Sequence, residues 1–269
     1  MENQHSTSTD MKHTFIHLLF FTILSLLLSS CAKEDNNIDN PIEESKVVED
    51  ICTKMDDINF INFCYTNFDI DKDGKVSMIE ADAVSEVRIT AKEISSLTGV
   101  EYFTNITVLE CYLNELTSLN VSGCIHLKTL YCMYNRLTSL DVSGCTNLER
   151  LDCSYNELMS LNISGCANLT SLNCHHNALT SLDVSDCVNL SVLDCKYNKL
   201  TSLDVSGCVN LTMLYCHHNE LTSLDVSSCA ELSKLDCSNN PLTILYLNAK
   251  STWSYISYPE GVNKESKAI

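Results

Sequence analysis

Residues that bend or break a chain are scarce in this sequence: 7 of its 269 residues are glycine and 3 are proline. Such low contents exclude a collagen-like chain and a chain dominated by flexible linkers. Basic residues are also few, 17 against 35 acidic ones, which leaves a formal net charge of −18. A field of that sign repels phosphate backbones, so we expect no nucleic-acid partner.

Motifs that carry catalysis are absent as well. The sequence contains no nucleophile elbow, no H-E-x-x-H zinc motif and no glycine-rich phosphate-binding loop. Its many serines fall in repeated Thr-Ser-Leu and Val-Ser-Gly segments, where turn chemistry explains them. We therefore predict that the protein is not an enzyme.

The N-terminal region has the features of an export signal. A mostly apolar run over residues 15–28 follows two basic residues and is too short to span a bilayer comfortably. The run ends in Leu-Ser-Ser-Cys, which resembles the lipobox of bacterial lipoproteins. The resemblance implies a signal peptide over residues 1–30 and acylation of Cys31, the mature N-terminus. An ordinary signal peptide with a chance cysteine is the alternative, and Met11 is an alternative start.

The segment after Cys31 reads as a tether. Residues 31–46 are rich in Asn, Asp and Glu, a composition that stays solvated. Lys-Glu-Asp after the cysteine resembles a signal that sends some Gram-negative lipoproteins to the outer surface. We expect a lipid-anchored protein of the outer membrane, and both the cell surface and the periplasmic face remain open.

Residues 69–80 match the twelve-residue EF-hand calcium loop at every ligand position. Gly74 allows the sharp turn, and four carboxylates packed this closely repel one another unless a cation lies between them. The predicted calcium ligands are the side chains of Asp69, Asp71, Asp73 and Glu80, the backbone carbonyl of Lys75, and Ser77 directly or through water. A degenerate acidic turn is the alternative.

Helices are expected to flank this loop, over residues 58–68 before it and 77–87 after it. The sequence has no second loop to pair with it, which disfavours a calcium sensor. We predict a structural calcium site within a short, helical, EF-hand-like cap over residues 47–88.

From residue 106 the sequence repeats every 21 residues, seven times in register. Each unit contains Leu-x-Cys, then asparagine three positions after the cysteine, then leucine two positions later. The pattern resembles the leucine-rich repeat, L-x-x-L-x-L-x-x-N-x-L, with cysteine in place of one leucine. Repeats of this kind behind an EF-hand-like segment resemble a family of surface lipoproteins of Gram-negative bacteria.

The resemblance implies a leucine-rich-repeat solenoid over residues 89–247, mostly β and turns, with a parallel sheet on its concave face. Within each strand the leucine and cysteine face inward, and the residues between them face outward. The asparagine lies where the chain turns and can satisfy buried backbone groups of the neighbouring rung. Residues 248–269 would form a C-terminal cap and tail.

Cysteine is the outlier of the composition, with 16 residues. Thirteen fall on two columns with the 21-residue spacing, and the others are Cys31, Cys52 and Cys64. A line of thiols about 4.8 Å apart does not converge on a tetrahedral zinc ion. Neighbouring rungs are close enough for disulfides, but burial as small apolar side chains is the favoured interpretation.

The outward strand positions vary, and three neighbouring columns hold six of the 11 tyrosines. Tyrosine offers a large contact area with a hydroxyl, which suits a protein hot spot or sugar stacking. The β-propensity of tyrosine is the alternative, although the opposite Leu-Thr-Ser-Leu segment contains none. The predicted ligand-binding residues are Tyr134, Tyr155, His176, Tyr197 and His218, flanked by Tyr131 and Tyr215.

Two histidine pairs, His175-His176 and His217-His218, lie two repeats apart. Two rungs separate the pairs by roughly 10 Å, too far for one shared zinc ion, so a column of surface substitutions is favoured. Two functions remain open. One is recognition of a protein or glycan at the concave face, and the other is a structural rod of the envelope without a specific ligand.

Overall fold

The structure is a computed structural model that describes residues 48–267. These residues belong to one compact unit. The predicted signal peptide, the lipidation site Cys31 and the tether over residues 31–46 lie outside the described residues.

Three short helices precede the repeats: η1 (Ile51–Lys54), α2 (Ile58–Phe68) and α3 (Met78–Ala83). Each begins at a residue whose side chain accepts hydrogen bonds from the first turn, as expected of good N-caps. These caps are Asp50, Asp57 and Ser77, and Ser77 forms a capping box with Glu80.

Helix α2 has the bounds predicted from the sequence, whereas α3 is shorter than the helix expected over residues 77–87. It ends because the chain becomes extended at Val84 and joins the sheet as β1, Glu86–Arg88. The buried face of α2 consists of Phe60, Cys64 and Phe68.

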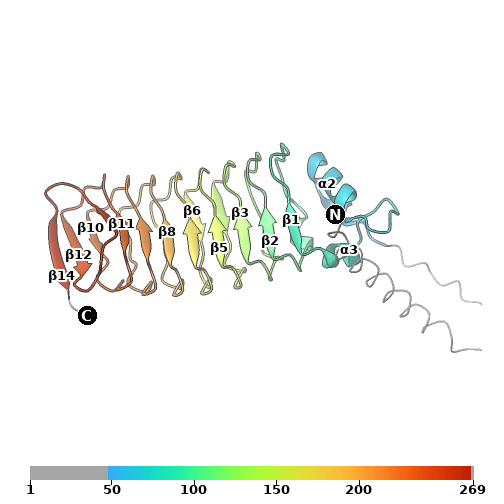
Figure 1. The fold of residues 1–269 in the computed structure, drawn as a ribbon. Helices are drawn as coiled ribbons and strands as arrows, with labels where there is room; N and C mark the ends of the chain where they lie inside the picture. Colours follow the sequence, from blue (N-terminus) through green and yellow to red (C-terminus); the bar gives the residue numbers. More distant parts are fainter. Residues whose placement is uncertain (1–47, 268–269) are drawn as a thin grey trace, which may run out of the picture. The chain divides into compact units, whose positions relative to one another are not determined.

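The repeats form a solenoid with a nine-stranded parallel sheet along one side (Figure 1). Neighbouring strands pair in register one repeat apart, so that Leu130 lies opposite Leu151 and Leu151 opposite Leu172. In sheet order the strands are β1, β2 (Val108–Glu110), β3 (Thr129–Tyr131), β5 (Arg150–Asp152), β7 (Ser171–Asn173), β8 (Val192–Asp194), β9 (Met213–Tyr215), β11 (Lys234–Asp236) and β13 (Tyr255–Ser257).

The other side of the solenoid has turns and shorter sheets, which agrees with the prediction of a solenoid made mostly of β-strands and turns. The 3-10 helix η2 (Val100–Tyr102) precedes β2. The strands of this return side are β4 (Ser139–Asp141) paired with β6 (Ser160–Asn162), and β10 (Ser223–Asp225), β12 (Ile244–Asn248) and β14 (Asn263–Lys267) in one sheet. Thus the segment after residue 247 continues the strand pairing through β13 and β14.

Leucine and cysteine fill the interior, as the alternation predicts. All thirteen cysteines of the two columns are buried free thiols, like Cys52 and Cys64. Burial raises the pKa of the thiols in the two columns, for example to about 12 for Cys111, which keeps these column thiols protonated and unreactive.

A column of asparagines, all buried except the half-buried Asn177, joins each rung to the one before it. The side-chain amide of Asn156 donates to the carbonyls of Cys132 and Cys153, at 3.0 and 3.2 Å. Its Oδ1 accepts from the backbone N–H of Leu137 at 2.9 Å. The same pattern recurs at Asn135, Asn177, Asn198, Asn219 and Asn240. This column supplies partners for backbone groups that the sheet leaves buried and unpaired.

One aspartate joins the helical segment to the first turn of the solenoid. The Oδ1 of Asp57 caps α2, and its Oδ2 accepts from the backbone N–H and the hydroxyl of Ser95, at 2.7 and 2.8 Å. Burial opposes ionisation of this carboxyl, but the hydrogen bonds from Ser95, Phe60 and Asn59 outweigh it and lower the pKa of Asp57. The ring of Phe103 packs between those of Phe60 and Phe68, with centroids 6.5 and 5.2 Å away. The helices therefore cover the first turn.

Candidate functional site

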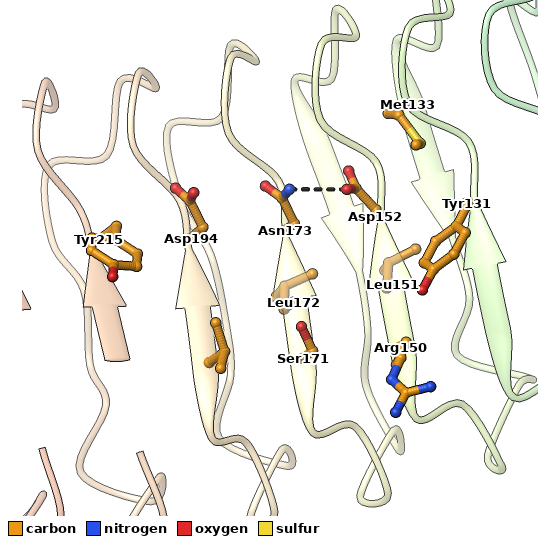
Figure 2. Close-up of a pocket in the computed structure, with 11 residues that line it drawn as sticks. Tyr131, Met133, Arg150, Leu151, Asp152, Ser171, Leu172, Asn173, Asp194 and Tyr215 are labelled. Carbon is orange, nitrogen blue, oxygen red and sulfur yellow. Dashed lines mark hydrogen bonds between the residues drawn. The ribbon is translucent and has the colours of Figure 1, made fainter. Parts of the chain in front are cut away.

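The outer surface of the nine-stranded sheet, called the sheet face below, contains a hollow of about 280 Å³. Tyr131 and Tyr215 lie at its two ends, as Figure 2 shows. Their strands are four rungs apart in the sheet, which corresponds to about 19 Å at the usual strand spacing. The smaller side chains of Asp152, Asn173 and Asp194 occupy the same column on the three strands between them. The hollow exists because two large side chains flank three small ones.

Two of the three polar side chains between the tyrosines are bonded to each other, and the third is paired with a lysine. The amide of Asn173 donates to Asp152 Oδ2 at 2.9 Å, the dashed line in Figure 2. Lys196 Nζ lies 2.8 Å from Asp194 Oδ2, so that this carboxylate is partly neutralised. Arg150 and Ser171 line the hollow from the strand starts and were not among the residues predicted from the sequence. Within the repeats their column contains no aromatic side chain, so the tyrosine pattern gives no signal at these positions.

The other predicted residues form a different feature, an aromatic column made of Tyr134, Tyr155, His176, Tyr197 and His218. Successive rings stack with centroids 4.4, 4.5, 4.2 and 4.2 Å apart and nearly parallel planes. All five residues follow the strands and have left-handed backbones, with φ between 50° and 56°. Left-handed aromatic residues are uncommon, so β-propensity does not account for this column.

The stacking limits which parts of these aromatic rings can contact a ligand. Each inner ring has both faces covered by its neighbours, which leaves edges, hydroxyls and ring nitrogens toward solvent. Tyr134, Tyr155 and Tyr197 are 47%, 38% and 38% exposed. The inner rings therefore have no open face on which a sugar could stack, and the choice between a protein and a sugar ligand stays a prediction.

His175 and His217 lie beside the aromatic column rather than in it. Their Nδ1 atoms are 3.6 Å from the carboxylates of Asp194 and Asp236 on the following rungs. Burial lowers the pKa of both imidazoles, although the facing carboxylates oppose that shift. Within residues 48–267, neither histidine joins a group of three metal-ligating side chains.

The predicted calcium loop brings three of its ligands together. Carboxylate oxygens of Asp69, Asp71 and Asp73 all lie within 4.8 Å of one another. Asp69 Oδ1 is buried and has no hydrogen-bond partner, which is costly for a carboxylate oxygen unless a cation binds it. Backbone N–H groups of Asp73, Gly74 and Lys75 hold the other oxygens of the cluster in place. The aspartates fit a hard divalent cation.

Glu80 and Ser77 have other partners in this structure. The Oε1 of Glu80 accepts from the N–H groups of Ile70 and Asp71, and its Oε2 accepts from the N–H and hydroxyl of Ser77. Glu80 therefore closes the loop through its backbone and lies outside the aspartate cluster. The predicted ligand roles of Lys75, Ser77 and Glu80 stay predictions.

The loop has partners within the chain despite the lack of a second loop. Val76 is buried, its N–H donates to Asp50 Oδ1 at 3.1 Å, and its carbonyl accepts from the N–H of Ile51 at 2.9 Å. Asp50 also accepts a hydrogen bond from the hydroxyl of Tyr65 on α2. The segment before α2 thus supplies hydrogen-bond partners for the backbone of the loop at Val76.

Residues 125–165 and 167–207 match the family model described as leucine-rich repeats in two copies. The fold is a leucine-rich-repeat solenoid. Among curated proteins, none matches the chain by sequence. The predicted fold class, a leucine-rich-repeat solenoid with a short helical N-terminal cap, is confirmed.

Solved leucine-rich-repeat structures resemble the chain over most of its length. The functional domain of InlJ from Listeria monocytogenes, whose description includes a cysteine ladder, is 30% identical over 74% of this chain, with a TM-score of 0.55. The protein LIC12759 of Leptospira interrogans is 21% identical over 71% of this chain, with a TM-score of 0.59, and shows the fold alone. The chain covers 52% and 58% of these structures, little more than half of each.

A third neighbour is TLR13 in a complex with the RNA ssRNA13. It is 22% identical over 65% of this chain, which covers 30% of it, and the TM-score is 0.51. At that identity the likeness shows the fold alone. Leucine-rich-repeat proteins in general are non-enzymatic binding scaffolds, and the solenoid fold is typical of protein-interaction modules.

Proposed function

We propose that this protein is a lipid-anchored protein of the bacterial outer membrane that binds a protein partner at the sheet face without catalysis. The observation that carries the proposal is the hollow flanked by Tyr131 and Tyr215. Tyrosine is enriched in protein interfaces and is among the residues that contribute most of their binding free energy. Two tyrosines that flank a polar hollow therefore suit a contact with a protein. The exposed edges of the aromatic column, which contains Tyr155 and His176, extend the proposed contact surface beyond the hollow.

The negative charge of the protein favours a partner that carries a basic segment. The column between the two tyrosines carries Asp152 and Asp194, and the whole chain has a formal net charge of −18. A partner with a basic segment is therefore attracted over distance and oriented on contact. The same charge disfavours nucleic acid. A protein is favoured over a glycan because the inner rings of the aromatic column have no open face.

The lipid anchor at Cys31 is supported by the sequence of the export signal. No helix among residues 48–267 is long and apolar enough to cross a bilayer. Acylation would hold the protein at the outer membrane, and the tether would let the sheet face reach a partner.

Calcium is proposed as a structural ion held by Asp69, Asp71 and Asp73, with Lys75, Ser77 and Glu80 as the remaining predicted ligands. When bound, calcium would neutralise three carboxylates that otherwise repel one another. The loop is joined to η1 through Val76 and to the first solenoid turn through α2 and Asp57. The stability of the calcium loop therefore affects the stability of the first solenoid turn.

Site-specific photo-crosslinking in cells that express the protein tests the proposed function. A photoreactive residue replaces Asn173 on the sheet face in one variant and Asp183 on the return side in another. We expect a covalent adduct with a protein at position 173 and none at position 183. A similar yield at both positions, or an adduct only at 183, contradicts the proposed site. A carbohydrate adduct overturns the choice of a protein partner, and no adduct at either position favours the structural rod.

A further inference from the structure

Arg150 is the one arginine whose side chain has no hydrogen bond or ion pair within the part of the chain that the structure describes. The other two arginines of the sequence are paired with glutamates. Glu149, the residue before Arg150, is also occupied, because its carboxylate lies 3.2 Å from Lys128 Nζ. Arg150 lines the hollow and is exposed, so its guanidinium is free to bind a group from outside.

Asp152 carries the opposite charge and has no ionic partner among residues 48–267. Its Oδ1 accepts from the backbone N–H and the hydroxyl of Ser154, at 3.0 and 2.6 Å, and its Oδ2 accepts from the amide of Asn173 at 2.9 Å. All three donors are neutral, and a carboxylate can accept about four hydrogen bonds. Asp152 can therefore accept one further donor from a ligand.

These two opposite charges lie on one strand but do not pair with each other. Arg150 begins β5 and Asp152 ends it, and residues two positions apart on a strand face the same side. Figure 2 shows the guanidinium of Arg150 directed away from the carboxylate of Asp152. Both groups therefore stay available to a ligand that lies on the sheet face.

The charges of the hollow are separated along the direction of the strands. At the strand starts, the neighbours of Arg150 in the hollow are the uncharged Ser171 and Val192. The carboxylates of Asp152 and Asp194 lie at the strand ends. Arg150 is the one cation among the residues that line the hollow. A ligand that fits this surface needs a negative group at one end and a positive group at the other.

We propose that the hollow binds an extended segment of the protein partner in which a basic and an acidic residue stand two positions apart. The basic side chain binds Asp152 and the acidic side chain binds Arg150. The inference rests on the proposed function, which places a protein partner at the sheet face. It goes further because it assigns Arg150 and Asp152 as the residues that determine which segment binds.

The spacing of the two charges matches an extended chain. Residues two positions apart in a strand face the same side, with their Cα atoms about 7 Å apart, and Arg150 and Asp152 have this spacing on β5. The partner segment therefore runs along the strands of the sheet, between the side chains of Tyr131 and Tyr215. Either order of the basic and acidic residues is possible, depending on the direction in which the segment runs.

Two opposite charges make the hollow selective. A segment with two basic residues brings a positive charge to Arg150, and a segment with two acidic residues brings a negative charge to Asp152. The guanidinium can bind a carboxylate through two parallel hydrogen bonds, which fixes the position of the acidic residue. Arginine and tyrosine are also enriched among the residues that contribute most of the binding free energy of protein interfaces.

Variants that remove one charge at a time are the first test, with the adduct yield at position 173 as the readout. Arg150→Gln and Asp152→Asn should each lower this yield about tenfold at limiting concentrations, because each removes one of the two ion pairs. Lys234→Gln is the matched control, since Lys234 also begins a strand, lies outside the hollow and loses the same charge as Arg150. It should leave the yield unchanged. Full yield in both hollow variants, or an equal loss in the control, overturns the inference.

The sequence of the captured partner gives the second test. The peptide crosslinked at position 173 is sequenced by mass spectrometry, and we expect it to contain a basic and an acidic residue two positions apart. Changing that acidic residue of the partner to lysine should lower the yield about tenfold with the unmodified protein and restore it with Arg150→Glu.

The outcomes separate this inference from the proposed function. A crosslinked segment without the charge pair, or no restoration with Arg150→Glu, overturns the inference and leaves protein binding at the sheet face intact. No protein adduct at position 173 of the otherwise unmodified protein refutes the proposed function itself, and this inference with it.

Discussion

Asn156→Ala is expected to lower the free energy of unfolding by about 3 kcal/mol, measured by urea denaturation followed by circular dichroism. The substitution removes the amide that bonds Cys132 and Cys153 and the oxygen that accepts from Leu137. It leaves the buried N–H of Leu137 without a partner, which costs about 1–3 kcal/mol, and it removes one of the two asparagine bonds at each carbonyl, about 1 kcal/mol each. The effect is large because the lost bonds join two rungs.

Asn168→Ala is the matched control. Asn168 also recurs every 21 residues, but it is exposed and donates only to the carbonyl of Thr146, at 3.0 Å. We expect a loss of about 0.5 kcal/mol, since water replaces an exposed hydrogen bond at little cost. Equal losses for the two variants would show that burial of the asparagine column does not determine the stability of the solenoid.

Asp69→Asn is expected to weaken calcium binding at least tenfold, measured by isothermal titration calorimetry. It removes the charge of the one carboxylate among residues 48–267 that has a buried oxygen without a partner. In chelator the same variant should unfold at the temperature of the unmodified protein or above it, because it relieves repulsion among three carboxylates within 4.8 Å.

The opposite effects with and without calcium distinguish a binding site from an acidic turn. Glu157→Gln, an exposed charge change on the solenoid, is the control and should leave the affinity unchanged. No heat of calcium binding by the unmodified protein, or equal affinity for Asp69→Asn, would refute the site. Either result would favour the degenerate acidic turn.

Periodicity made the solenoid predictable. The 21-residue spacing fixes both the parallel register and the inward leucine and cysteine columns. A shift of one residue in the register of a strand would turn its apolar side chains outward. The role of the asparagines also followed from the sequence, since Asn156 and its equivalents recur where each strand ends. The bounds of α2 followed from the apolar spacing of residues 58–68.

The surface was less predictable because it depends on backbone conformation and on contacts between rungs. Tyr155 and its column were expected on strands, but they are left-handed and stacked. Asn239 at the equivalent position was the available signal, since asparagine tolerates that conformation. Ligand spacing alone could not show that Glu80 bonds the loop backbone. The link from Asp57 to Ser95 spans 38 residues and has no sequence pattern.

The most direct measurement of partner binding at the sheet face is the adduct yield at position 173 in the Tyr131→Ala, Tyr215→Ala double variant. Removing both side chains that flank the hollow should weaken binding at least tenfold, about 1.4 kcal/mol, and reduce the yield accordingly at limiting concentrations. Tyr155→Ala with Tyr197→Ala should also reduce it, whereas Tyr246→Ala on the return side should not. A folded double variant that keeps the full yield at position 173 would contradict binding in the hollow between Tyr131 and Tyr215.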